Sequence, residues 1–92
     1  MDERKTEMAS RMAELFALPK DLVAGLCHME LLGDREFFLE GHGGILSYSE
    51  ELIDISAGRL VVRVRGSALT LRAMTEREVR IGGRISAVEL VH

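Results

Sequence analysis

The chain has 92 residues and a net charge of −3, with 47% apolar and 29% charged side chains, a composition typical of one soluble globular domain rather than a disordered segment. Its single cysteine, Cys27, excludes an internal disulfide and favours a reducing compartment. The mixed charges at the start exclude a secretory signal peptide, and no apolar run approaches the ~20 residues of a membrane span, so we expect a cytoplasmic protein without direct membrane insertion.

Residues 3–18 are predicted to form an amphipathic helix that ends at Pro19, because proline cannot continue a helix. Its apolar side chains follow the spacing of one helical face, and they are Met8, Met12, Leu15 and Phe16. Methionine adapts to irregular surfaces, which suits contact with another protein as well as packing within the domain. The sequence leaves open whether this helix packs on its own domain or on a partner.

Residues 26–91 are predicted to form a β domain, which together with the helix makes residues 1–92 a single domain. Short β-type runs alternate here with glycine-containing turns. There are about eight such runs, at residues 27–32, 36–40, 45–49, 52–56, 59–65, 68–73, 78–81 and 85–91. We predict a mainly β fold, an N-terminal helix followed by these short strands in an antiparallel sandwich or open barrel. A short β-solenoid is the alternative.

The stretch from residue 59 to residue 91 shows the clearest alternation of apolar and polar side chains, which is typical of half-buried strands. The side chains expected in the core are Leu60, Val62, Val64, Leu69, Leu71 and Ile81. The alternation slips at Ser86, because Ile85 and Val88 cannot share one face of a regular strand. A β-bulge is therefore predicted at this position.

Charge is distributed unevenly along the chain. Residues 22–58 hold one basic and seven acidic side chains, whereas residues 59–92 hold seven basic and three acidic ones. Two interpretations follow: ion pairs across neighbouring strands, or a self-complementary surface that makes the protein a homo-oligomer. In the second case, acidic and basic surfaces on opposite sides would join copies into a ring or a filament.

Four arginines are expected on the outer face of the sheet, as a basic stripe for interactions. They are Arg63, Arg65, Arg72 and Arg80. A nucleic-acid-binding module would interleave such a stripe with aromatic side chains, yet the four aromatic residues all lie outside this part of the chain, and the pI is about 5.6. We therefore expect a protein partner and no nucleic acid.

The sequence contains no catalytic constellation. Cys27, His28 and His42 lack the spacing of a metal site, and the glycine-rich stretch 41–44 precedes a β-type run instead of the helix N-terminus that a phosphate-binding loop needs. We expect no enzyme activity, no metal and no cofactor. A nucleic-acid-binding module and a small-ligand-binding or enzymatic domain are the alternative functions.

The order of short motifs between residues 18 and 91 resembles the YabP/YqfC family of sporulation proteins, and more closely its YqfC branch. The matching segments are Leu18-Pro19-Lys20-Asp21, Glu40 to Tyr48, Ile53-Asp54-Ile55, Gly58 to Val62, Gly66 to Leu71 and Val79 to Ile85. The second segment contains a family-like turn motif, made of Glu40, His42, Gly44 and Tyr48.

The resemblance implies a non-catalytic assembly or adaptor protein in endospore formation. It also implies a location in the mother-cell compartment and a membrane-associated sporulation protein as partner. The chain would then be peripheral to a membrane only through that partner. The family has no established enzymatic activity, which agrees with the missing catalytic set.

Overall fold

The computed structural model describes residues 26–92, and the helix predicted at residues 3–18 lies outside them. The described part consists of β1 (His28–Leu32), β2 (Glu36–Glu40), β3 (Gly44–Tyr48), β4 (Leu52–Ala57), β5 (Leu60–Met74) and β6 (Glu78–Val91). The first four strands have five or six residues each, whereas β5 has 15 and β6 has 14. The prediction of a mainly β fold is confirmed, but the count of about eight strands is wrong.

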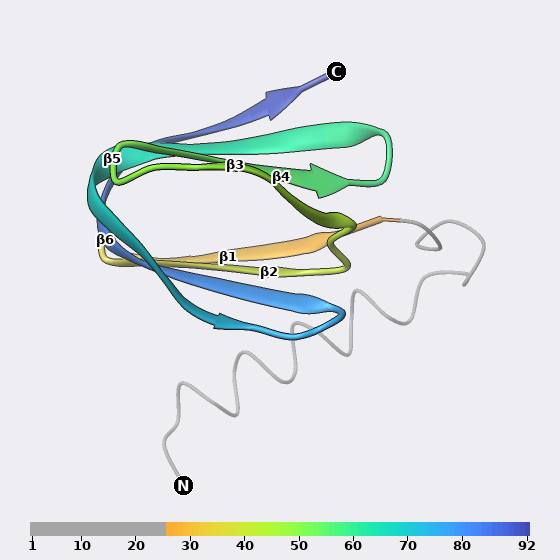
Figure 1. Ribbon diagram of the computed structural model, residues 1–92, viewed down its shortest axis with the longest axis horizontal. Helices are drawn as coiled ribbons and strands as arrows, with labels where there is room; N and C mark the ends of the chain where they lie inside the picture. Colours follow the sequence, from red (N-terminus) through yellow and green to blue (C-terminus); the bar gives the residue numbers. More distant parts are fainter. Residues whose placement is uncertain (1–25) are drawn as a thin grey trace, which may run out of the picture.

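The six strands form one open antiparallel sheet in the order β1-β2-β6-β5-β4-β3. Every neighbouring pair is antiparallel, which contradicts the solenoid alternative, because the coils of a β-solenoid stack their strands in parallel. Both β5 and β6 bend near their middles, so the sheet folds over and its halves face each other as two layers (Figure 1).

Each layer combines one half of each long strand with one short hairpin. The upper layer of Figure 1 contains β3, β4, the first half of β5 and the second half of β6. The lower layer contains β1, β2, the first half of β6 and the second half of β5. We call the end where the long strands bend, at the left of the figure, the bend end, and the opposite end, with the β5–β6 turn, the turn end.

The predicted turns at Gly66-Ser67 and Gly82-Gly83 are bends inside the long strands instead. Pairing between β5 and β6 shifts register repeatedly in this region. The strands approach so closely that a Cβ on Gly66 would lie 1.9 Å from the carbonyl oxygen of Arg84. A residue without a side chain lets both strands continue through the bend, which is why eight expected runs merge into six strands.

The bulge predicted at Ser86 is confirmed. Arg65 lies opposite Ala87 while Gly66 lies opposite Ile85, so Ser86 is the extra residue of β6. The Ser86 hydroxyl donates a hydrogen bond to the carbonyl oxygen of Arg65 at 3.1 Å. The bulge restores the alternation and leaves the Ile85 side chain in the core, where it is 8% exposed.

The tips of the two short hairpins cover backbone that the bend leaves without a neighbouring strand. At the tip of the β3–β4 hairpin, the carbonyl oxygen of Glu50 accepts a hydrogen bond from the amide of Leu69 at 2.8 Å. At the tip of the β1–β2 hairpin, the carbonyl oxygen of Asp34 accepts one from the amide of Ile85 at 2.7 Å. The hairpins therefore satisfy buried backbone donors and hold the folded sheet at the bend end.

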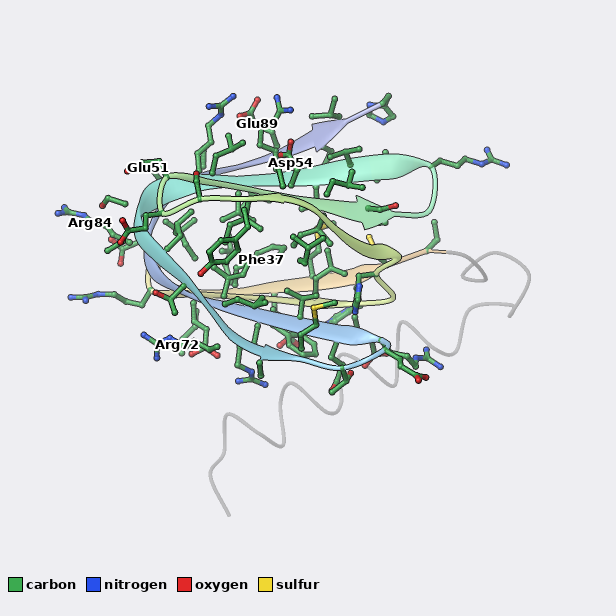
Figure 2. All side chains as sticks on the ribbon, in the orientation of Figure 1. Phe37, Glu51, Asp54, Arg72, Arg84 and Glu89 are labelled. Atoms are coloured by element: carbon green, nitrogen blue, oxygen red, sulfur yellow. The ribbon has the colours of Figure 1, made fainter. Side chains whose placement is uncertain are left out.

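The core lies between the two layers, with Phe37 near its centre (Figure 2). Its members are Phe37, Leu39, Ile53, Ile55, Ala57, Val62, Val64, Leu69, Val79, Ile81 and Ile85. Of the six side chains expected in the core, four are buried, and Leu60 and Leu71 are half-buried. No polar or charged side chain of residues 26–92 is buried, so the polar chemistry of this part of the chain lies on its surface.

Candidate functional site

The bend distributes the four predicted arginines over both layers. Arg63 and Arg65 lie in the first half of β5 and belong to the upper layer. Arg72 lies in the second half of β5 and Arg80 in the first half of β6, so both belong to the lower layer. The single stripe expected from the sequence is therefore divided into two pairs on the outer faces of different layers.

Arg63 forms a two-pronged ion pair with Asp54, its direct neighbour on β4. Nε donates to Oδ1 at 2.9 Å and Nη2 donates to Oδ2 at 3.1 Å, and the Asp54 side chain is 14% exposed. The hydrogen bonds from Arg63 hold the pKa of Asp54 below its usual value, although burial opposes them. The charge of Arg63 and a hydrogen bond with Ser47 add to the lowering.

Asp54 is expected to make the domain sensitive to acid. Because its pKa is lower in the folded chain, its contribution to stability is present above the unfolded value of about 3.9 and is lost as the pH falls through the folded value. The native protein should therefore be more stable than Asp54→Asn at about pH 6, and this difference should shrink below about pH 4. Urea unfolding at both pH values measures the difference, and a constant difference down to about pH 2 contradicts the prediction.

Two more of the four arginines are paired across neighbouring strands. Nε of Arg65 donates to the carboxylate of Glu89 on β6. Arg80 donates to Glu36 of β2 at 2.8 Å and lies over the Phe38 ring, 5.3 Å from the ring centroid. For three of the four arginines, the interpretation of the charge pattern as cross-strand ion pairs is confirmed. The aromatic partner of Arg80 was missed, because Phe38 is distant in sequence and joins it only through the pairing of β2 with β6.

The family-like turn motif joins β3 and the loop before it to the second half of β5 and the turn that follows it. Nε2 of His42 donates to the carbonyl oxygen of Thr75 at 2.7 Å, while Nδ1 accepts from the amide of Gly44 at 2.9 Å. The hydroxyl of Tyr48 accepts from the amide of Leu71 at 3.0 Å. Both ring nitrogens of His42 are engaged in hydrogen bonds, so this side chain connects the loop before β3 to the turn between β5 and β6.

Removing the imidazole of His42 is expected to lower the free energy of unfolding by about 1–3 kcal/mol, because His42→Ala removes two hydrogen bonds to the backbone. His28→Ala is the matched control, since His28 bonds only Glu30 of its own strand among the described residues, at 3.1 Å. The control should change stability by about 0.5 kcal/mol or less. Chemical unfolding of both variants measures this, and equal losses would contradict the role assigned to His42.

Two shallow hollows lie at opposite ends of the lower layer. The acidic hollow, at the turn end, is lined by Glu40, Thr75, Glu76, Arg77 and Glu78. The basic hollow, at the bend end, is lined by Arg35, Glu36, Ala68, Arg72, Gly83 and Arg84. Of these charged residues, only Glu40 and Arg72 are candidate site residues predicted from the sequence. The others contribute there only to the uneven distribution of charge. Glu76, Arg77 and Glu78 are neighbours in sequence and are joined by Glu40 through the pairing of β2 with β6, whereas Arg35, Arg72 and Arg84 come from separate parts of the chain and meet only in the fold.

The remaining candidates for chemistry are dispersed. Among residues 26–92, no group of three or more histidine, cysteine, aspartate or glutamate side chains is placed to hold a metal ion. Cys27 is a half-buried free thiol. In the same part of the chain, no helix is long and apolar enough to cross a membrane. The two charged hollows are therefore the candidate binding surfaces of the described domain.

Comparison with known proteins gives a family. The family model described as the YabP family matches residues 26–92, which is the whole of the described β domain. The chain is also similar to the uncharacterized protein YqfC of Bacillus subtilis (strain 168), with 23% identity over 91 residues that cover 99% of this chain and 98% of that protein. No solved structure matches the chain. The resemblance found in the order of short motifs is thus confirmed, and the chain belongs to the YabP family.

Proposed function

We propose that the chain is a non-catalytic assembly or adaptor protein of endospore formation, and that it acts with a membrane-associated sporulation protein. The observation that carries the proposal is the family match over residues 26–92, to which the order of motifs adds the likeness to sporulation proteins. On this proposal the protein works in the mother-cell compartment. It reaches a membrane through its partner.

The surface of the described domain supports a role in association. Its hollows are lined mainly by arginine and glutamate. Charged surfaces of this kind guide the orientation and the rate of encounter with another protein. Nucleic acid is a poorer fit, because three of the four predicted arginines are already paired with carboxylates.

Deletion of the gene from the spore-forming strain that encodes it tests the role in sporulation. The deletion strain is expected to form far fewer heat-resistant spores while growing normally in rich medium, and a second copy of the gene should restore the count. A normal number of heat-resistant spores in the deletion strain would exclude the proposed role.

Affinity capture tests the adaptor role. A tagged copy, purified in detergent from membranes of sporulating cells, is expected to retain one membrane protein that is absent from vegetative cells. Tagging that membrane protein should capture this chain in return. The adaptor role would be contradicted if the tagged chain captured no membrane protein, even if the deletion reduces sporulation.

A further inference from the structure

We infer that copies of this chain associate through the two hollows, with the acidic hollow of one copy contacting the basic hollow of another. The partner is therefore a second copy of the chain. This contact is independent of the proposed role in sporulation, because it depends only on the charges and geometry of the folded domain.

The acidic hollow holds like charges close together. Glu40 and Glu78 are directly opposite each other on β2 and β6, an arrangement that destabilises a pair of strands. Glu76 adds a third carboxylate from the adjoining turn, and Arg77 is the one base in the lining. Among residues 26–92, none of these three carboxylates forms an ion pair. The hollow thus has an excess of acid that a cationic side chain from outside would neutralise.

The basic hollow has the reverse composition: three arginines and one glutamate line it. Its glutamate, Glu36, already accepts a hydrogen bond from Arg80, and Arg35 forms an exposed ion pair with Asp34 at 3.8 Å. The Arg72 side chain lies across the backbone of β6, since a Cβ on Gly82 would be 1.7 Å from its Nε. Within the described residues, Arg72 and Arg84 form no ion pair, and Figure 2 shows both at the bend end. These guanidinium groups are available to bind carboxylates in a two-pronged geometry.

The two hollows are matched in charge and separated in space. Each has three groups of one sign and one of the other. Arg84 follows Glu78 by six positions on β6, which is about 20 Å along the strand. One domain therefore cannot neutralise its acidic hollow with its own basic hollow, whereas a second copy supplies the missing charge for either. Charge complementarity of this kind favours a partner identical to the chain itself.

The mass of the full chain in solution, measured by light scattering and sedimentation across salt concentrations, tests the association. We expect assembly at low ionic strength that weakens as salt is added, because the screening length falls from about 8 Å at 0.15 M to about 3 Å at 1 M. Two outcomes support the contact: a closed dimer that uses both hollows at once, or a longer ring or filament. A chain that stays monomeric at low salt and high concentration overturns it.

Charge reversals test whether the hollows are responsible. Glu78→Arg and Arg84→Glu should each weaken association by about tenfold or more, since like charges then meet. The matched controls are Glu51→Arg and Arg59→Glu, which change the net charge equally but lie outside both hollows. The controls should change association by about twofold or less. If Glu51→Arg weakens association and Glu78→Arg does not, the contact lies at the β3–β4 tip and the inference is wrong.

A mixing experiment completes the test. The Glu78→Arg variant keeps its basic hollow, and the Arg84→Glu variant keeps its acidic hollow. An equimolar mixture is therefore expected to form one-to-one complexes that neither variant forms alone. Absence of recovery in the mixture contradicts the pairing of the two hollows. Should a reversed variant fail to fold, Glu78→Gln and Arg84→Gln in the same mixture test the same contact with a smaller change.

Discussion

Replacing Gly83 with alanine is expected to lower the free energy of unfolding by about 3–5 kcal/mol, which is large for a single methyl group. Gly83 has a φ of 131°, a conformation that residues with a side chain rarely adopt. The added Cβ would also lie 2.5 Å from the carbonyl oxygen of Ala68. This oxygen belongs to the backbone of β5 at the bend, so it cannot move aside as the end of a flexible side chain can. Urea unfolding followed by circular dichroism measures the loss.

Gly33 provides the matched control. It also has a positive φ, 55°, but an added Cβ would meet no atom within 4 Å. Gly33→Ala therefore introduces only backbone strain, about 1 kcal/mol. Gly82→Ala offers an intermediate case, because its Cβ would meet the side chain of Arg72, which can rotate away. Equal stability of the Gly83→Ala and Gly33→Ala variants would show that close approach at the bend is not what requires glycine.

The second large effect is expected at Phe37, where substitution by alanine should lower the free energy of unfolding by about 3–5 kcal/mol. The Phe37 side chain is 1% exposed and lies between the two layers, opposite Ile81 in register. Truncation removes buried apolar area and leaves a cavity that a folded sheet, anchored at the bend, can fill only in part. Thermal and urea unfolding both report this loss.

Phe38 is the neighbouring control with the same side chain on the other face of β2. Its ring is half-buried and lies under the guanidinium of Arg80, so Phe38→Ala should lower stability by about 1 kcal/mol. If both substitutions are equally destabilising, the assignment of the inner and outer faces of β2 is wrong. If Phe38→Ala is the more harmful one, β2 presents its opposite face to the core.

The ion pairs reduce the number of arginines that are available to bind a partner. The sequence suggested four arginines as one interaction surface, but three of them are neutralised by carboxylates on neighbouring strands. Arg72 is the member of that set without an ion pair among the described residues, and the fold places it beside Arg84 and Arg35. The basic surface available for association is therefore the basic hollow at the bend end, and the outer face of the upper layer contributes little to it.

Local pattern was sufficient to predict the class of fold and much of the core. The alternation in β5 assigned Val62 and Val64 to the buried side, since neighbouring residues of a strand point to opposite faces whatever the strand pairs with. The break in alternation at Ser86 predicted a bulge for the same reason. The order of short motifs was enough to indicate the family. These properties depend on residues close together in the chain, so local sequence patterns are enough to predict them.

Long-range pairing decided the rest. Whether Gly66 and Gly82-Gly83 end strands or bend them depends on how closely the partner strand passes, and glycine is compatible with both. Which arginines are paired depends on the register of β4, β5 and β6, which places Asp54 opposite Arg63 and leaves Arg72 without a carboxylate among the described residues. Strand pairing also places Glu40 opposite Glu78 and gathers the three arginines of the basic hollow from separate parts of the chain. These features depend on the folded arrangement of the strands, because strand pairing sets the electrostatic neighbours of a side chain and linear order does not specify that pairing.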